Sequence, residues 1–138
     1  MGFDTFGVFE SALEEIFSPS AASVILQSSA NKCGRQTCRR ITLKIKDKGN
    51  VLAYLSHLKE SMKWGKMSFQ DVDLENGIGK IKVVDSFESL VHKRTQPSCH
   101  FLRGFFAGFL SELFGRDISI TEIKCAGKGD DHCDFEFE

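Results

Sequence analysis

The sequence has no excess of charge of one sign and no long hydrophobic run. Among its 138 residues, 18 Lys and Arg stand against 19 Asp and Glu, which gives a formal net charge of -1. Nucleic-acid-binding domains usually carry a basic excess or a basic stripe, so we expect no nucleic-acid partner. The most apolar run, residues 101–114, is shorter than a bilayer crossing and contains Arg103 and Glu112. We therefore expect no membrane partner either.

A secretory signal is also missing from the first residues. Asp4, Glu10, Glu14 and Glu15 lie where a signal peptide would carry a basic region. We therefore expect a cytoplasmic protein. In a reducing compartment, the 5 cysteines of the chain are more often metal ligands or reactive thiols than disulfides.

The first half of the sequence has the periodicity of helices. Phe6, Phe9 and Leu13 recur at spacings of three and four, which is typical of an amphipathic helix. Ser18-Pro19 is a helix start, with an N-cap hydroxyl and a proline at the first helical position. Another apolar stripe over residues 51–62 predicts a further helix, with Gly65 as its C-terminal cap. The segment between these two helices fits either a strand or a helical continuation.

The second half alternates between apolar and polar residues at period two. Residues 67–72 and 80–83 flank Asn76-Gly77, and Asn-Gly is a strong signal for a hairpin turn. A helix capped by Ser98 is expected to end at Gly115, and two strands are expected over residues 117–124 and 133–138. The sequence thus predicts a single α+β domain over residues 1–138, with N-terminal helices and an antiparallel sheet of about four strands.

Three cysteines and one glutamate can meet at one end of the last two strands. Glu122-x-x-Cys125 ends the first strand, Cys133 begins the second, and Cys99 lies at the start of the preceding helix. Three thiolates and a carboxylate suit tetrahedral zinc, and a site with four protein ligands is structural rather than catalytic. The alternative is that the cysteines are small buried core residues. The neighbouring His100 and His132 are substitute ligands in a second alternative.

The residues from Cys99 to Phe137 resemble the 4-vinyl reductase domain family. The shared pattern is a Cys, a helix with the paired glycines Gly104 and Gly108, a Glu-x-x-Cys, and a closing Gly…Cys-x-Phe. The resemblance implies an α+β fold similar to that of transport-particle (TRAPP) subunits, and a domain that binds small, mostly hydrophobic molecules. Family members include sensor domains of aromatic-responsive transcription activators and a subunit associated with bacteriochlorophyll synthesis.

The resemblance also bears on the metal and on assembly. In zinc-containing members, the metal is bound at the positions that match Cys99, Glu122, Cys125 and Cys133 here, and all four residues are present. Related domains are commonly dimers, so we expect a homodimer. The sequence carries no ATPase or DNA-binding segment, so any signal is expected to pass to a separate signalling partner.

The 13 phenylalanines, against one Trp and one Tyr, predict a core or pocket that is poor in hydrogen-bond donors. The paired glycines indicate close backbone approach, either to the sheet or to a bound ligand. The expected pocket residues are Trp64, Phe101, Phe105, Phe109 and Ile120, although such aromatic stripes usually fill the core.

The function expected from these features is a stand-alone sensor or carrier of a hydrophobic or aromatic molecule, with a structural zinc site. Two alternatives remain open: an accessory subunit of a tetrapyrrole or other reductase, and an interaction adaptor resembling trafficking subunits. An enzyme is not expected, because the sequence shows neither a nucleotide-binding glycine motif nor a pairing of nucleophile and base. Cys33 and Cys38 are expected to be two independent buried thiols, with a thiol pair as the alternative.

Overall fold

The computed structural model describes residues 3–90 and 99–138. Its elements follow the order α1 (Phe3–Ile16), α2 (Pro19–Thr42), α3 (Lys48–Ser61), β1 (Lys66–Asp73), β2 (Ile78–Val84), α4 (Phe87–Leu90), α5 (His100–Phe114), β3 (Ile120–Lys124), the short 3-10 turn η1 (Ala126–Lys128) and β4 (Cys133–Phe137). The α+β fold expected from the sequence is confirmed. Within the described ranges, no helix combines the length and apolarity that a membrane crossing needs.

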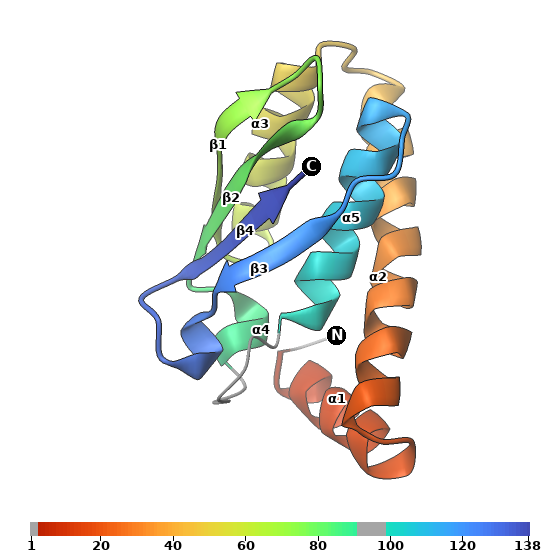
Figure 1. The fold of residues 1–138 in the computed structure, drawn as a ribbon, viewed down its shortest axis with the longest axis vertical. Coiled ribbons are helices and arrows are strands. Elements are labelled where there is room, and N and C mark those ends of the chain that lie inside the picture. The colour runs from red at the N-terminus through yellow and green to blue at the C-terminus, as the bar shows by residue number, and fades with distance from the viewer. Residues whose placement is uncertain (1–2, 91–98) are drawn as a thin grey trace.

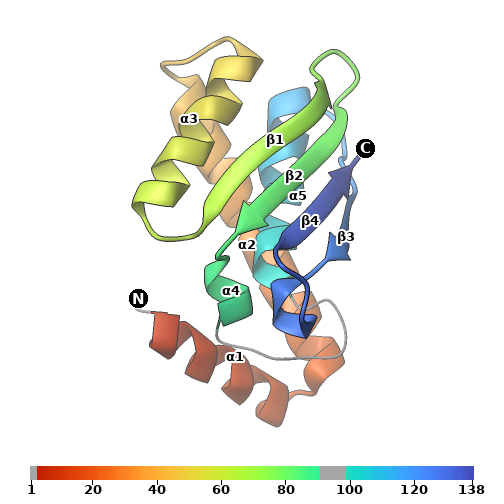
Figure 2. The ribbon, with the colours of Figure 1, turned by 90° about the vertical axis from the view of Figure 1, so that its left-hand side faces the viewer.

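The four strands form one antiparallel sheet in the order β1-β2-β4-β3. Figure 1 shows α5 lying against this sheet, with the long helix α2 on the far side of α5. Seen from the side in Figure 2, α3 lies beside β1, and α1 crosses the end of the molecule near α4. The N-terminal end of α5 and one end of the sheet therefore meet close to α4.

The ends of the N-terminal helices follow the residues that the sequence provides. The Ser18 hydroxyl accepts a hydrogen bond from the backbone N–H of Ala21 at 3.1 Å, and Pro19 occupies the first helical position. Helix α2 then continues to Thr42, so most of the ambiguous segment is helical. Helix α3 ends at Ser61 with Met62 as its C-cap, so the prediction of Gly65 as the cap was wrong.

The predicted hairpin is confirmed by the register of β1 and β2. Lys66 pairs with Val84 and Phe69 pairs with Ile81. Gly77 has a φ of 69° in the turn, a left-handed conformation that glycine adopts without steric cost. The predicted cap Ser98 lies outside the described residues, and Cys99 is the N-cap of α5.

Close contact between α2 and α5 explains the paired glycines of α5. A Cβ atom built on Gly104 would collide with the backbone of Gln27, and one built on Gly108 would collide with the backbone of Asn31. Gly34 of α2 meets the backbone of α5 in the same way. The glycines therefore face a second helix, and the expectation that they face the sheet or a ligand was wrong. The tight helix pair fixes where α5 begins.

Candidate functional site

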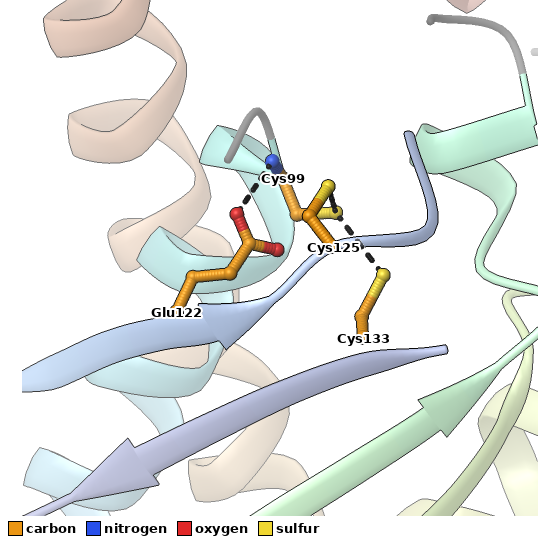
Figure 3. Close-up of side chains that lie close together, drawn as sticks. All are labelled: Cys99, Glu122, Cys125 and Cys133. Carbon is orange, nitrogen blue, oxygen red and sulfur yellow. Dashed lines mark hydrogen bonds between the residues drawn. The ribbon is translucent and has the colours of Figure 1, made fainter. Parts of the chain in front are cut away.

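Four potential metal ligands converge at the start of α5. Cys99 is the N-cap of α5, Glu122 lies in β3, Cys125 precedes η1, and Cys133 is the first residue of β4. Figure 3 shows their side chains pointing toward one another from these separate elements. One ligand atom from each residue lies within 4.8 Å of all the others. Residues 34 positions apart in the chain thus form one compact cluster.

The distances between the sulfur atoms match those of a tetrahedral zinc site. The Cys99 Sγ lies 3.8 Å from the Cys125 Sγ and 3.6 Å from the Cys133 Sγ. A tetrahedron with Zn–S bonds of about 2.3 Å has sulfur–sulfur distances of about 3.8 Å. The three thiols are therefore spaced as a metal would hold them, without a disulfide between them.

Glu122 supplies an oxygen atom that lacks a partner. Its Oε1 accepts a hydrogen bond from the backbone N–H of Cys99 at 3.2 Å. Its Oε2 is buried and has no hydrogen-bond partner among the described residues. A buried carboxylate oxygen without a partner is costly, and a metal ion at the thiols would remove that cost. The donor set and this orphaned oxygen both fit a zinc ion.

Burial and the neighbouring thiols set the protonation of the cluster. Burial raises the pKa of Glu122 to about 7, against the opposing effect of its hydrogen bonds with Cys99. Hydrogen bonds with the other two thiols raise the pKa of Cys99, and the bond with Cys125 raises that of Cys133 to about 12. Without metal, the Cys99 and Cys133 thiols are therefore protonated at neutral pH. Metal binding must release their protons.

The two histidines beside the cysteines have other partners. His132 lies 3.0 Å from the Asp134 carboxylate, and the His100 Nδ1 lies 3.2 Å from the Ser23 hydroxyl. The loop itself is held by a hydrogen bond of 2.9 Å from the backbone N–H of Cys125 to the Asp130 carboxylate. Among the described residues, the group that could hold a metal contains neither histidine.

Glu88 is a functional neighbour that the sequence analysis missed. Its carboxylate accepts hydrogen bonds from the backbone N–H groups of Phe101 at 2.8 Å and Leu102 at 3.0 Å. It thereby caps the start of α5, although burial raises its pKa well above the usual value. The side chain comes from α4, more than ten residues upstream, and no local spacing in the sequence indicates this contact.

A second feature of this end of the molecule is an apolar cavity of about 290 Å³ between α1, α2, α4 and α5. Its lining residues, of which only Ser29 is polar, are Phe6, Phe9, Ile25, Leu26, Ser29, Trp64, Phe87 and Phe101. The aromatic rings pack edge to face, as the distance of 5.2 Å between the ring centres of Phe6 and Phe87 illustrates.

The expected pocket residues fall into three places. Trp64 and Phe101 line the cavity. Phe105 and Phe109 are buried in the core, where the ring of Phe105 lies 5.1 Å from that of Trp64. Ile120 lines a separate and more polar hollow beside α2 and α5. The sequence analysis missed the two phenylalanines of α1, whose helical stripe was assigned only to packing.

Comparison with known proteins identifies the family. Residues 80–138 match the 4-vinyl reductase domain family. The resemblance seen in the sequence is thereby confirmed, and all four clustered ligands lie in the matched segment.

Two relatives illustrate how far the similarity extends. The chain is 28% identical over 102 residues to MJ0150 of Methanocaldococcus jannaschii, covering 74% of this chain and 58% of that protein. It is 33% identical over 66 residues to the phenol regulator MopR of Acinetobacter guillouiae, covering 44% of this chain and 12% of MopR. The chain thus spans little more than half the length of the first relative and a small part of the second.

Two known structures share the fold. The phenol-responsive sensory domain of the transcription activator PoxR superposes with a TM-score of 0.89 at 20% identity, over 99% of this chain and 74% of that one. A trafficking protein particle complex subunit 3 from Naegleria fowleri superposes with a TM-score of 0.66 at 12% identity, over 99% and 93%. The expected similarity to trafficking-complex subunits is therefore confirmed at the level of the fold.

Proposed function

We propose that this protein binds a small hydrophobic or aromatic molecule and acts as a sensor or carrier of it. The apolar cavity carries this proposal, because ligand sites are typically concave, largely apolar and provided with few polar groups. Its volume of about 290 Å³ suits a compact molecule of one or two rings. The phenol-responsive domain of PoxR and the phenol regulator MopR support the same class of ligand.

We propose a structural zinc ion at Cys99, Glu122, Cys125 and Cys133. Zinc bound to three thiolates and one carboxylate carries a net charge of about -2 and has no open position for water, so it would stabilise rather than catalyse. The ion would join the start of α5 to β3 and β4. Since Phe101 lies two residues beyond Cys99 and lines the cavity, the metal would also hold one wall of the ligand site.

We further propose that the protein forms a homodimer through α1 and the start of α2. Large apolar side chains are exposed along this face, including Val8 at 70%, Ile16 at 71% and Val24 at 63%. A second copy would bury them, since exposed apolar patches of this kind commonly mark interfaces. The cavity lies under the same helices, so dimerisation would also cover its entrance.

The single tryptophan of the chain gives a direct test of ligand binding. Trp64 lines the cavity, so we expect phenol or toluene to change its fluorescence saturably. Ser29→Phe would place a ring at the cavity wall and should abolish the change. Ser28→Phe is the matched control, because Ser28 is exposed on α2 and lines the other hollow. Unchanged Trp64 emission at saturating concentrations of both molecules would contradict the proposal.

A further inference from the structure

Lys59 is a buried lysine whose amine has no anionic partner in the described part of the chain. The side chain is only 5% exposed. Its Nζ lies 3.8 Å from the centre of the Trp64 ring and 5.0 Å from that of Phe105. Apart from these aromatic faces, its one hydrogen-bond partner among the described residues is the Met62 sulfur at 4.0 Å. A thioether is a weak acceptor, so the hydrogen-bonding capacity of the amine is almost unused.

Such a position is costly for a charged amine. Burial lowers the pKa of Lys59, and the nearby Cys33 opposes this effect only in part. Buried lysines are rare unless they are paired, because the ammonium loses its water without gaining an anion. The aromatic faces of Trp64 and Phe105 stabilise a cation but accept no conventional hydrogen bond. An anion beside the amine would supply the missing interaction.

The amine borders a groove between the end of α2 and α3. This groove has a volume of about 480 Å³. Its lining residues, none of which is acidic, are Thr37, Arg40, Ile41, Lys44, Ile45, Tyr54, Leu58, Lys59 and Met62. Three cations thus face a surface that is otherwise mostly apolar. The neighbouring Arg35 and Arg39, by contrast, pair with Glu112 of α5.

We propose that this groove binds a small organic anion with an apolar body, whose acidic group contacts Lys59. Arg40 and Lys44 would hold the acidic group from the solvent side, and the apolar body would lie on Ile41, Leu58 and Met62. A carboxylate on an aromatic ring or on a short aliphatic chain has this chemistry. The ring of Tyr54, which is 44% exposed, could then cover the bound molecule.

This site is distinct from the aromatic cavity of the proposed function. Lys59 lines the groove, Trp64 lines the cavity, and the two side chains lie against each other. The cavity has no charged residue in its wall, whereas the groove has three. The groove proposal therefore does not depend on the cavity being a ligand site. Occupancy of one site would be felt at the other through the Lys59–Trp64 contact.

Isothermal titration with a matched pair of probes tests the groove. Naphthalene-2-carboxylate and naphthalene-2-carboxamide have nearly the same shape, and only the first is charged. We expect the metal-loaded chain to bind the carboxylate at least tenfold more tightly at low ionic strength. Lys59→Met keeps the apolar stem and should bring the two affinities to the same value. Lys48→Met is the control, because Lys48 also faces an aromatic ring, that of Phe114, but lies outside the groove.

Three results would overturn the proposal. The first is equal binding of the two probes by the unmodified chain, and the second is a preference that survives Lys59→Met. If Lys59→Met does not fold, the exposed double variant Arg40→Gln/Lys44→Gln replaces it, and an unchanged preference in that variant overturns the proposal. The third is loss of carboxylate binding in Ser29→Phe. That result would place the anion in the cavity and leave the proposed function standing.

Discussion

Gly108→Ala should destabilise the protein, although alanine is the better helix former. Gly108 lies in the middle of α5, where alanine is favoured over glycine by about 1 kcal/mol. The added methyl group, however, would lie 2.7 Å from the Asn31 carbonyl carbon and 2.8 Å from its Cα, and closer still to the carbonyl oxygen. Ordinary carbon–carbon contacts are about 3.5–4.0 Å. The colliding atoms are backbone, so no side-chain rotation relieves the overlap.

The magnitude follows from what must move. To accept the methyl group, α5 has to shift by roughly 1 Å away from α2, along an interface that also contains Gly34 and Gly104. Overpacking costs about 1–3 kcal/mol where side chains can adjust, and a backbone collision lies at or above the upper end. After subtracting the gain in helix propensity, we expect a net loss of about 2 kcal/mol. For a chain of this size, that lowers Tm by about 5–10 °C.

Thermal and urea unfolding followed by circular dichroism measure this loss. Gly49→Ala is the matched control, since Gly49 lies in the first turn of α3 and its added methyl group would meet only side-chain atoms. We expect the control to stay within about 1 kcal/mol of the unmodified chain. A Gly108→Ala protein as stable as the unmodified chain would refute the helix–helix contact described here.

The remaining predictions concern the metal cluster and the start of α5. Cys125→Ser should release the metal and lower the free energy of unfolding by several kcal/mol, whereas Cys38→Ser, buried far from the cluster, should leave the metal content unchanged. In metal-free protein, the raised pKa of Glu122 should make stability fall as pH rises from about 4.5 to about 7, and metal-loaded protein, whose ligands are deprotonated, should lose this trend in pH-dependent melting. Glu88→Ala should cost about 2 kcal/mol and speed hydrogen exchange of the Phe101 amide.

The fold could be predicted from the sequence where local signals are strong. Ser18-Pro19 and Asn76-Gly77 carry their own backbone preferences, so the start of α2 and the hairpin turn were found correctly. Gly65 was assigned as a helix cap by the same logic, yet the helix ends four residues earlier. Helix ends depend on tertiary contacts as well as on residue type, and those contacts were not visible in the sequence.

The candidate site divides in the same way. The clustered cysteines and Glu122 follow from strand periodicity, because a hairpin brings both of its ends together. The role of Glu88 depends on α4 lying against the start of α5, which no spacing encodes. The same holds for Phe6, whose place in the cavity wall depends on how α1 crosses α2 and α4. Lys59 reads as an ordinary polar position of an amphipathic helix, and only its 5% exposure distinguishes it.

Native mass spectrometry of the protein purified without added metal tests the central claim most directly. The account predicts a mass excess of one zinc ion per chain, held by Cys99, Glu122, Cys125 and Cys133 and absent from Cys125→Ser. The same spectrum would show the proposed dimer and any small molecule that co-purifies. A chain that carries no metal and has all 5 of its thiols free for alkylation would contradict the zinc site and reduce the cluster to buried core cysteines.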